Sequence, residues 1–442
     1  MKFFFPDSQD FVDPSFDFLT ETRSPDRVVQ RDDKYAHELF PDPPFDGLLV
    51  SKAAVDPDHA SGSRYTMAQQ QRFRSEGARR YFRLDAIKTK RLALMGDCGA
   101  FSYISEPRPP VTVEKVTDFY ENAGVDYGVS VDHVILGFDP GLDQQQMTLD
   151  GFAQPGAPRE RQAITLELAA DFLRVCRARR LVFEPIGVAQ GWSPLSYAKA
   201  VDQLQLMGYG YIGLGGMVGL KTVEVLACLK AVGDIRKRET RLHLFGITRL
   251  AHLESFTSYG VASFDSTSPL KKAFKDDTDN YFTSLEEAYA AIRVPQADAN
   301  PKLQKRIQAG LLDQRTAKDL ESRCLRLLRL FDRDEADIDE TLEALEHYGK
   351  VFDETSNWAE RYRRTLSDRP WKNCPCEVCK DFRAKGLGID VVLFRGAERN
   401  RRRGFHNLFV LYTTLQHRLM RTSRDAVLVP ADSSSGQKGG HL

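Results

Sequence analysis

The feature that most constrains the fold is a repeated alternation of short apolar runs with helical stretches. The alternation of strands and helices is typical of a parallel sheet. Seven strands within about 220 residues favour a (β/α)8 barrel of the α/β class over an open sheet, although an eighth strand is not evident. The seven runs are Gly47–Val55, Arg91–Met95, Tyr127–Phe138, Leu181–Val188, Tyr211–Met217, Leu242–Ile247 and Val261–Phe264.

Helix signals separate several of these runs. The clearest predicted helix is Pro194–Met207, because Ser193 precedes it as an N-cap and proline stands at its first position. The segments Ala163–Arg179 and Lys221–Val232 repeat the helical pattern of apolar residues.

The sequence pattern changes after about residue 275, where charged segments with helical periodicity replace the strand–helix alternation. The tail is rich in Ser, Gly and Gln and is predicted to be disordered. We therefore divide the chain into an N-terminal arm (1–44), the main part of the barrel (45–275), a helical insertion (276–370), a zinc-binding subdomain with a closing helix (371–429) and a disordered tail (430–442).

The composition is that of an ordinary globular protein. Of 442 residues, 42% are hydrophobic and 28% are charged, which excludes a disordered chain. No stretch approaches the roughly 20 apolar residues that span a bilayer, so no membrane partner is expected. Lys+Arg 62 balance Asp+Glu 62, so any nucleic-acid surface must be a local patch.

A C-x-C-x2-C cluster predicts a structural zinc site. Cys374, Cys376 and Cys379 lie close enough to face one tetrahedral ion, and soft thiolate ligands favour Zn²⁺. His406 is the best candidate for the fourth ligand, and His417 is the alternative. Four protein ligands leave no position for substrate, which indicates a structural role. The other interpretation is three surface thiols without a metal.

The cysteines also indicate the compartment. Three of the seven fall within six residues, so they are not spaced as a disulfide framework. The apolar start Phe3–Phe5 is too short for a secretory signal. We expect a cytoplasmic, reducing environment.

Polar residues and glycines gather at the ends of the predicted strands, where the chemistry of such barrels takes place. Carboxylates without metal-type histidines suit chemistry at a sugar carbon, since one can attack the anomeric carbon while another handles protons. No lysine or histidine base stands out among them. Taken singly, each aspartate is also explained as a helix N-cap or a loop ion pair. The residues are Asp97, Asp132, Gln190, Gly215, Gly216 and Asp265.

Two neighbours of these aspartates have two interpretations each. Cys98 is either a reactive thiol or a buried small residue, and the absence of a placed base favours burial. His133 either donates to a phosphate or base, or is a plain loop histidine.

Basic clusters are candidates for weak contacts to a nucleic-acid backbone. Lys271 and Lys272 follow Asp265, and Arg401, Arg402 and Arg403 precede His406. A solvated basic face explains the arginines equally well. The insertion helices mix both charge signs, which favours a structural role over DNA binding.

These motifs, taken in order, resemble the tRNA-guanine transglycosylases. The segment Gly96–Phe101 resembles their D-S-G-G-[FY], Gln190-Gly191 their Q-G, and Gly213–Met217 their glycine loop. Phe264-Asp265-Ser266 resembles their F-D-[CS]. The three clustered cysteines and His406-Asn407 resemble their zinc site in the same order.

The resemblance implies a TIM-type barrel enzyme, a pentosyltransferase that replaces guanine with a 7-deazaguanine. Asp265 would be the nucleophile on C1′, forming a covalent glycosyl-enzyme, and Asp97 the general acid/base. Asp132, Gln190 and the Gly215–Gly216 backbone would recognise the base edge. The target nucleotide must leave its stack to reach such a pocket.

With its departures from the tRNA enzymes, the sequence resembles the DNA-acting branch of this superfamily (DpdA, DNA 7-deazaguanine transglycosylase). The segment after Asp265 is not the V-L-P-T-R that engages the anticodon loop, and 109 positions separate Asp265 from Cys374. The glutamate that helps accommodate an aminomethyl group is missing after Met217, which favours the nitrile base preQ0.

The resemblance implies DNA and preQ0 as partners. The enzyme either works alone or needs an ATP-using helper protein from the same gene island to open the duplex, and in the second case the energy comes from the helper, because the chain has no P-loop. Two alternatives stay open: the same exchange on tRNA in the queuosine or archaeosine pathway, and a non-catalytic zinc-containing nucleic-acid-binding protein.

Overall fold

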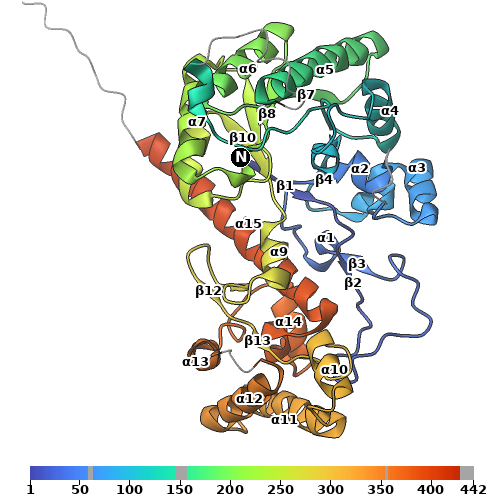
Figure 1. The fold of residues 1–442 in the computed structure, drawn as a ribbon, viewed down its shortest axis with the longest axis vertical. Helices are drawn as coiled ribbons and strands as arrows, with labels where there is room; N and C mark the ends of the chain where they lie inside the picture. Colours follow the sequence, from blue (N-terminus) through green and yellow to red (C-terminus); the bar gives the residue numbers. More distant parts are fainter. Residues whose placement is uncertain (58–62, 145–156, 354–356, 429–442) are drawn as a thin grey trace, which may run out of the picture.

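Eight parallel strands close a barrel, and helices surround it (Figure 1). The computed structural model describes residues 1–57, 63–144, 157–353 and 357–428. The prediction of a (β/α)8 barrel is confirmed, and each of the seven apolar runs overlaps one barrel strand. The barrel strands, in order around the wall, are β1 (Lys2–Pro6), β10 (Val261–Asp265), β9 (Arg241–Leu244), β8 (Tyr211–Leu214), β7 (Glu184–Ala189), β6 (Tyr127–Val129), β5 (Ala93–Asp97) and β4 (Gly47–Ser51).

The eighth strand is β1, at the very start of the chain. Phe4 pairs with Asp265 of β10 on one side and with Gly47 of β4 on the other, so β1 completes the ring. The prediction that residues 1–44 form an arm on the main domain is therefore wrong for Lys2–Pro6. A strand that is buried on both faces has a continuous apolar sequence. Over only five residues, such a sequence cannot be told apart from another short aromatic segment.

Alternation along β1 separates the inside of the barrel from the outside. Phe4 points into the barrel, where it packs with Leu49 and Met95. Phe3 and Phe5 point outward into the larger core beneath the helices, and the ring of Phe3 stacks on Phe264 at 5.0 Å between centroids. This two-sided burial fixes the register of the strand.

The helices around the barrel begin and end where the sequence predicts. The helix α6 spans Pro194–Met207, with the Ser193 hydroxyl accepting from Ser196 N–H and with Gly208 in the left-handed conformation at the C-terminus. The other surrounding helices are α2 (Lys52–Val55), α3 (Met67–Tyr81), α4 (Val113–Ala123), α5 (Pro158–Arg179), α7 (Thr222–Ile235), α8 (Leu253–Ser258) and α9 (Ser268–Lys275).

The rest of the N-terminal segment runs along the outside of the barrel toward the C-terminal part of the chain. It contains the strand pair β2 (Phe11–Val12) and β3 (Lys34–Tyr35), and the short helix α1 (Ala36–Leu39). Glu21 receives ion-pair contacts of 2.6 Å from both Arg395 and Arg399. These buried pairs tie the segment to the C-terminal unit.

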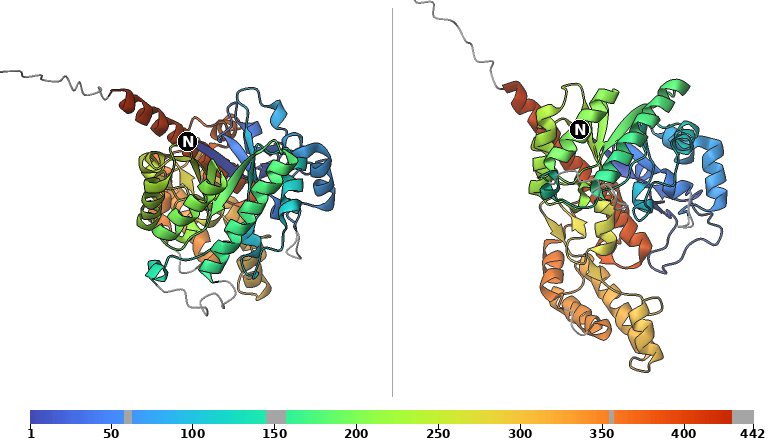
Figure 2. Two further views of the ribbon diagram at one scale, coloured as in Figure 1. Left: turned by 90° about the horizontal axis from the view of Figure 1, so that it is seen from above. Right: turned by 45° about the horizontal axis from the view of Figure 1, so that its top comes forward.

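The predicted insertion starts with strands rather than helices. The strands β11 (Tyr281–Phe282), β12 (Ala288–Tyr289) and β13 (Ile292–Arg293) precede its first helix. Four helices follow, and they lie at the end of the molecule opposite α5 and α6 (Figures 1 and 2). They are α10 (Pro301–Gln308), α11 (Gln314–Asp332), α12 (Ile338–Phe352) and α13 (Ala359–Asp368).

The C-terminal unit returns the chain to the barrel. It contains α14 (Glu377–Ala384), β14 (Leu393–Phe394), which pairs with β13, and the long helix α15 (Gly396–Leu428). Figure 1 shows α15 running from α14 past α9 along the barrel. The predicted tail 430–442 lies outside the described residues. Within the described ranges, no helix is both long and apolar enough to cross a membrane.

The closing strand generates a stability prediction. Phe3 is fully buried, so Phe3→Ala is expected to lower the free energy of unfolding by about 3–5 kcal/mol through lost burial and an unfilled cavity. Urea denaturation followed by tryptophan fluorescence measures it. The matched control is Phe101→Ala, because Phe101 is 57% exposed and its loss is expected to change stability by no more than about 0.5 kcal/mol. Equal effects of the two substitutions would contradict a closing role for β1.

Candidate active site and metal centre

The carboxyl ends of the eight strands meet at one face, the barrel mouth, and the predicted site residues lie there. Asp97 is the last residue of β5, and Asp265 is the last residue of β10. Gln190 directly follows β7, and Gly215 directly follows β8. Four positions that are far apart in the sequence are thus brought to the same end of the barrel, where such folds place their chemistry.

Asp132 and Gln190 form a buried pair at the mouth. The Gln190 amide nitrogen donates to Asp132 Oδ2 at 2.6 Å, and its carbonyl oxygen accepts from the Ile135 N–H at 3.1 Å. These two contacts set which end of the amide points at the carboxylate. Burial raises the pKa of Asp132 to about 6, although the hydrogen bonds from Gln190 and the Cys98 thiol lower it in part.

The glycine pair brings the backbone close to Gln190. A Cβ at Gly215 would lie 2.2 Å from the Gln190 amide nitrogen, and one at Gly216 would lie 2.4 Å from the Ile135 carbonyl. Gly216 also has a φ of 75°, in the left-handed region that favours glycine. Because neither position has room for a side chain, backbone groups line this part of the mouth.

Asp97 is held near the midpoint of its titration at neutral pH. Desolvation raises its pKa to about 7, and the neighbouring Asp132 carboxylate adds to the rise. Asp265, at the end of β10, adds a smaller effect in the same direction. A carboxyl group with this pKa can both donate and accept a proton near pH 7.

Asp265 has one oxygen fixed and one oxygen free. Its Oδ1 accepts from the Gly246 N–H at 3.0 Å and lies 3.2 Å from His243 Nε2. Among the residues that the structure describes, Oδ2 accepts no hydrogen bond. The side chain is only 11% exposed, so this oxygen belongs to a confined site rather than to an open surface.

His243 contacts Asp265 and was not among the residues that the sequence predicted for the site. It lies on β9, inside the barrel, and is fully buried. The signal was available, because His243 occupies an alternate position within the run Leu242–Ile247 and polar residues at such positions point into a barrel. The sequence pattern placed the chemistry at residues that end or directly follow a strand, whereas His243 lies one residue before the end of β9.

Cys98 and His133 are both buried, which favours the structural interpretation of each residue over the functional one. Cys98 is buried, and its thiol contacts Asp132 Oδ1 at 3.3 Å. Burial raises the pKa of this thiol well above its ordinary value, so a thiolate nucleophile is disfavoured. His133 is buried with its Nε2 at 2.9 Å from the Glu106 carbonyl, an acceptor to which it donates.

Of the residues predicted to contact a nucleic-acid backbone, the two lysines are exposed and two of the three arginines are buried. Lys271 and Lys272 are exposed on α9, directly after Asp265. Arg401 is partly exposed beside the Phe11 ring.

The prediction that Arg402 and Arg403 contact a nucleic-acid backbone is wrong. Arg402 is 3% exposed and donates to the Asp13 carbonyl at 2.7 Å. Arg403 is fully buried and donates to the carbonyls of Leu393 at 2.8 Å and Ala273 at 2.7 Å. Both guanidinium groups satisfy backbone carbonyls inside the protein, so neither is available to a phosphate.

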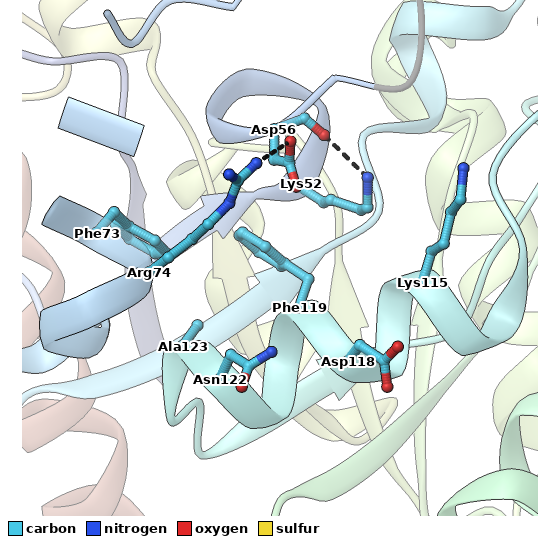
Figure 3. Close-up of a pocket in the computed structure, with 9 residues that line it drawn as sticks. All are labelled: Lys52, Asp56, Phe73, Arg74, Lys115, Asp118, Phe119, Asn122 and Ala123. Atoms are coloured by element: carbon cyan, nitrogen blue, oxygen red, sulfur yellow. Dashed lines mark hydrogen bonds and ion pairs between the residues drawn. The ribbon is translucent and has the colours of Figure 1, made fainter. Parts of the chain in front are cut away.

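A cavity of about 260 Å³ lies outside the barrel wall, between α2, α3 and α4 (Figure 3). Phe73 and Phe119 form its apolar wall, and Arg74 pairs with Asp56 at 2.7 Å. The candidate carboxylates of the mouth are not among its lining residues. The cavity is therefore separate from the site built by the strand ends.

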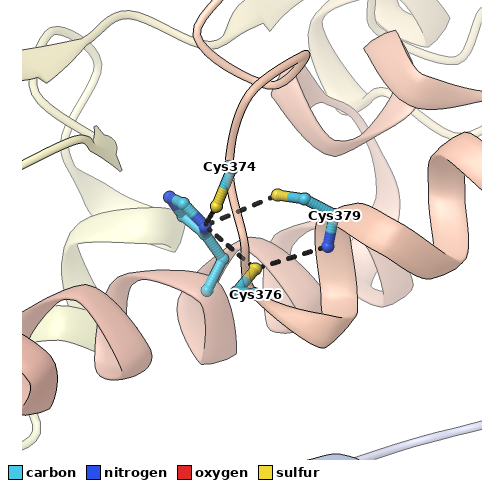
Figure 4. A group of neighbouring side chains, drawn as sticks. Cys374, Cys376 and Cys379 are labelled. Carbon is cyan, nitrogen blue, oxygen red and sulfur yellow. Dashed lines mark hydrogen bonds between the residues drawn. The ribbon is translucent and has the colours of Figure 1, made fainter.

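Three cysteines and one histidine form a cluster that could hold a metal ion (Figure 4). The ligand atoms of Cys374, Cys376, Cys379 and His406 all lie within 4.8 Å of one another. The His406 Nδ1 is 3.4 Å from the sulfurs of Cys374 and Cys376 and 3.5 Å from that of Cys379. His406 is thus the fourth member, as predicted, and the alternative His417 lies about three turns further along the same helix.

The surroundings of the cluster suit a metal. His406 Nε2 donates to the Phe282 carbonyl at 2.7 Å, which leaves the Nδ1 lone pair directed at the sulfurs. The Tyr281 ring stacks on the imidazole at 4.0 Å. The Cys379 N–H donates to the Cys376 sulfur at 3.3 Å and so helps to orient it. The donor set therefore fits a four-coordinate ion.

The chain is similar over nearly its whole length to a protein named DNA-guanine transglycosylase from Salmonella montevideo. The two are 46% identical over 430 residues, which cover 96% of this chain and 99% of that protein. No protein-family model matches the chain. The barrel and its mouth define a barrel enzyme with paired carboxylates, and the similarity shows that it is a guanine transglycosylase. The chain belongs to the DNA-guanine transglycosylase family.

The cluster generates a prediction about metal content. Purified protein is expected to contain one metal ion per chain, and Cys379→Ser is expected to lose most of it, because a missing thiolate opens the tetrahedral shell. Inductively coupled plasma mass spectrometry measures the stoichiometry. Cys324→Ser is the control, since Cys324 is a buried cysteine on α11 outside the cluster. Unchanged metal in the Cys379 variant would contradict the assignment.

Proposed function

We propose that this enzyme replaces guanine in DNA with the 7-deazaguanine base preQ0 through a covalent intermediate on Asp265. The observation that carries the proposal is the pair of carboxylates at the strand ends of the barrel mouth. Burial raises the pKa of Asp97 to about 7, and Asp265 has one oxygen held by hydrogen bonds and the other free. DNA as the substrate is supported by the name of the relative, and the nitrile base by the absence of the aminomethyl-accommodating glutamate.

The first step forms the glycosyl-enzyme. A deoxyguanosine extruded from the DNA enters the barrel mouth. Asp265 Oδ2 attacks C1′, the bond from C1′ to guanine N9 breaks, and its electron pair leaves with the base. Asp97, in its protonated form, donates its proton to the departing guanine.

The second step reverses the first with a different base. Asp97, now a carboxylate, removes the proton from N9 of the incoming 7-deazaguanine. N9 attacks C1′, and the ester bond to Asp265 breaks, which restores the free carboxylate. Two displacements at C1′ give net retention of configuration, as in retaining glycosidases. The phosphate backbone stays intact throughout.

Recognition of the base is proposed for the polar pair and the glycines. A guanine edge presents N–H donors, which the Asp132 carboxylate can accept, and a carbonyl, which a backbone N–H of the Gly215–Gly216 segment can bind. Gln190 is already oriented by Ile135 and keeps Asp132 in place. The exposed Lys271 and Lys272 are proposed to hold phosphates of the flanking DNA.

Zinc is proposed as the ion of the cysteine cluster, because three thiolates and one imidazole in a tetrahedral arrangement suit it. The site would be structural, since the four protein ligands leave no open position. Zinc bound there would link α14 to α15 and so hold the C-terminal unit together. The ATP-using helper protein also remains part of the proposal, as a means of opening the duplex.

The covalent role of Asp265 is tested by Asp265→Asn, which is expected to abolish base exchange because an amide is a poor nucleophile. The chain is expressed with a preQ0 supply, and DNA and tRNA nucleosides are analysed separately by mass spectrometry. The control is Asp171→Asn, because Asp171 is exposed on α5 away from the mouth. Deazaguanine in DNA from the Asp265 variant would refute the mechanism.

The same measurement separates the substrates. Deazaguanine found only in tRNA would overturn DNA as the substrate while leaving the chemistry in place. Its absence from both, with normal DNA binding, would favour the non-catalytic alternative.

The raised pKa of Asp97 predicts the pH dependence of guanine release. Only the protonated form serves as the acid, so the single-turnover rate of guanine release is expected to be highest below about pH 7 and to fall as the pH rises through that value. Asp97→Asn is expected to lower the rate by about 10²- to 10⁴-fold and to remove this inflection. Release of labelled guanine from DNA at a series of pH values measures both. An unchanged inflection in the variant would assign it to another group.

A further inference from the structure

A chain of hydrogen bonds runs through the inside of the barrel and ends on Asp265. His243 Nε2 lies 3.2 Å from Asp265 Oδ1, and its Nδ1 lies 2.5 Å from the Ser263 hydroxyl. The same hydroxyl is hydrogen-bonded to Tyr211 OH. Tyr211 begins β8, His243 lies on β9 and Ser263 lies on β10, so three neighbouring strands supply the chain.

Only one arrangement of protons satisfies every member of this chain around a neutral imidazole. The proposed attack requires a carboxylate at Asp265, which can only accept, so His243 Nε2 must carry the proton and donate it. Nδ1 then holds a lone pair, to which the Ser263 hydroxyl donates. The Ser263 oxygen in turn accepts from Tyr211, whose hydroxyl keeps its proton because burial raises its pKa to about 12.

The other tautomer is incompatible with an ionised Asp265. If Nδ1 carried the proton, the Nε2 lone pair would face the carboxylate oxygen at 3.2 Å, and the two would repel. The carboxylate therefore selects the tautomer with a proton on Nε2, and the Ser263 hydroxyl, itself held by Tyr211, stabilises that tautomer by donating to Nδ1. The ring cannot easily turn away, since the rings of Phe4 and Phe245 pack edge-on against it at 6.1 Å and 4.5 Å.

We propose that His243 is a positioning residue for the nucleophile, and that the Ser263–Tyr211 pair fixes its tautomer so that Asp265 attacks with Oδ2. The inference rests on the proposed role of Asp265. His243 and the Gly246 N–H together hold Oδ1, which stops the carboxylate from rotating and leaves Oδ2 as the oxygen without a partner. An attacking atom that is already oriented loses less conformational freedom on the way to C1′, which lowers the activation free energy.

The test compares four single substitutions in the full-length enzyme. His243→Leu removes the donor, while His243→Gln offers an amide N–H at a similar distance along the side chain. Ser263→Ala and Tyr211→Phe remove the groups that select the tautomer. The assay follows incorporation of radiolabelled guanine into genomic DNA, which requires the covalent step but no 7-deazaguanine.

The expected result is a graded loss in kcat with little change in the KM for DNA. His243→Leu is expected to lose about 10- to 100-fold, His243→Gln to recover part of that loss, and Ser263→Ala to lose more than Tyr211→Phe. Full activity of His243→Leu, or equal losses in the Leu and Gln variants at equal melting temperature, would overturn the inference in favour of simple packing.

Asp265→Asn, assayed in parallel, separates this inference from the mechanism that it depends on. If Asp265→Asn incorporates guanine, the proposed function itself fails. If Asp265→Asn is inactive and His243→Leu is fully active, only the positioning role fails.

A spectroscopic measurement keeps the inference testable if a variant does not fold. In the wild-type enzyme labelled with ¹⁵N-histidine, the nitrogen shifts of His243 are expected to show a proton on Nε2, and Ser263→Ala is expected to move the signal toward the other tautomer. A proton on Nδ1 alone in the wild-type enzyme would refute the proposal.

Discussion

The pairing of the first strand with the last is the interaction on which the rest of the structure depends. Without β1, the strands β4 and β10 would each present an open edge, and a barrel abolishes such edges only when it closes. The register of this pairing sets Phe4 beside Asp265, so the pairing that closes the barrel also fixes the position of the Asp265 carboxylate along the barrel axis. Closure of the barrel therefore also places the site residue.

The two strand-end aspartates differ because their surroundings differ. Asp97 stands near a second carboxylate in a desolvated position, and both effects raise its pKa to about 7. Asp265 receives N–H donors from His243 and Gly246 on one oxygen, which orients its carboxyl group. The two groups therefore suit different roles, since one can exchange a proton near neutral pH and the other is held in a fixed orientation.

Much of the fold and site could be predicted because strand ends and thiol spacing are local signals. The seven apolar runs, the helix Pro194–Met207 and the cluster with His406 are examples. What could not be predicted depends on long-range contacts. The strand β1 is recognisable only by its partner strands. Arg403 is charged and was therefore expected on the surface, but it is buried because carbonyls from two other segments accept its hydrogen bonds. His243 was missed because its role depends on Ser263 and Tyr211, on two other strands.

The position of β1 at the start of the chain has a consequence for synthesis. Phe3, Phe4 and Phe5 are synthesised long before one of their two partner strands, β10, which begins only at Val261. The carbonyl of Ala273 receives its hydrogen bond from Arg403 on α15, still later in the sequence. Until β10 is made, β1 can pair on only one edge, and an unpaired apolar strand edge favours aggregation of a nascent chain. The barrel can therefore close only after more than half of this sequence has been synthesised.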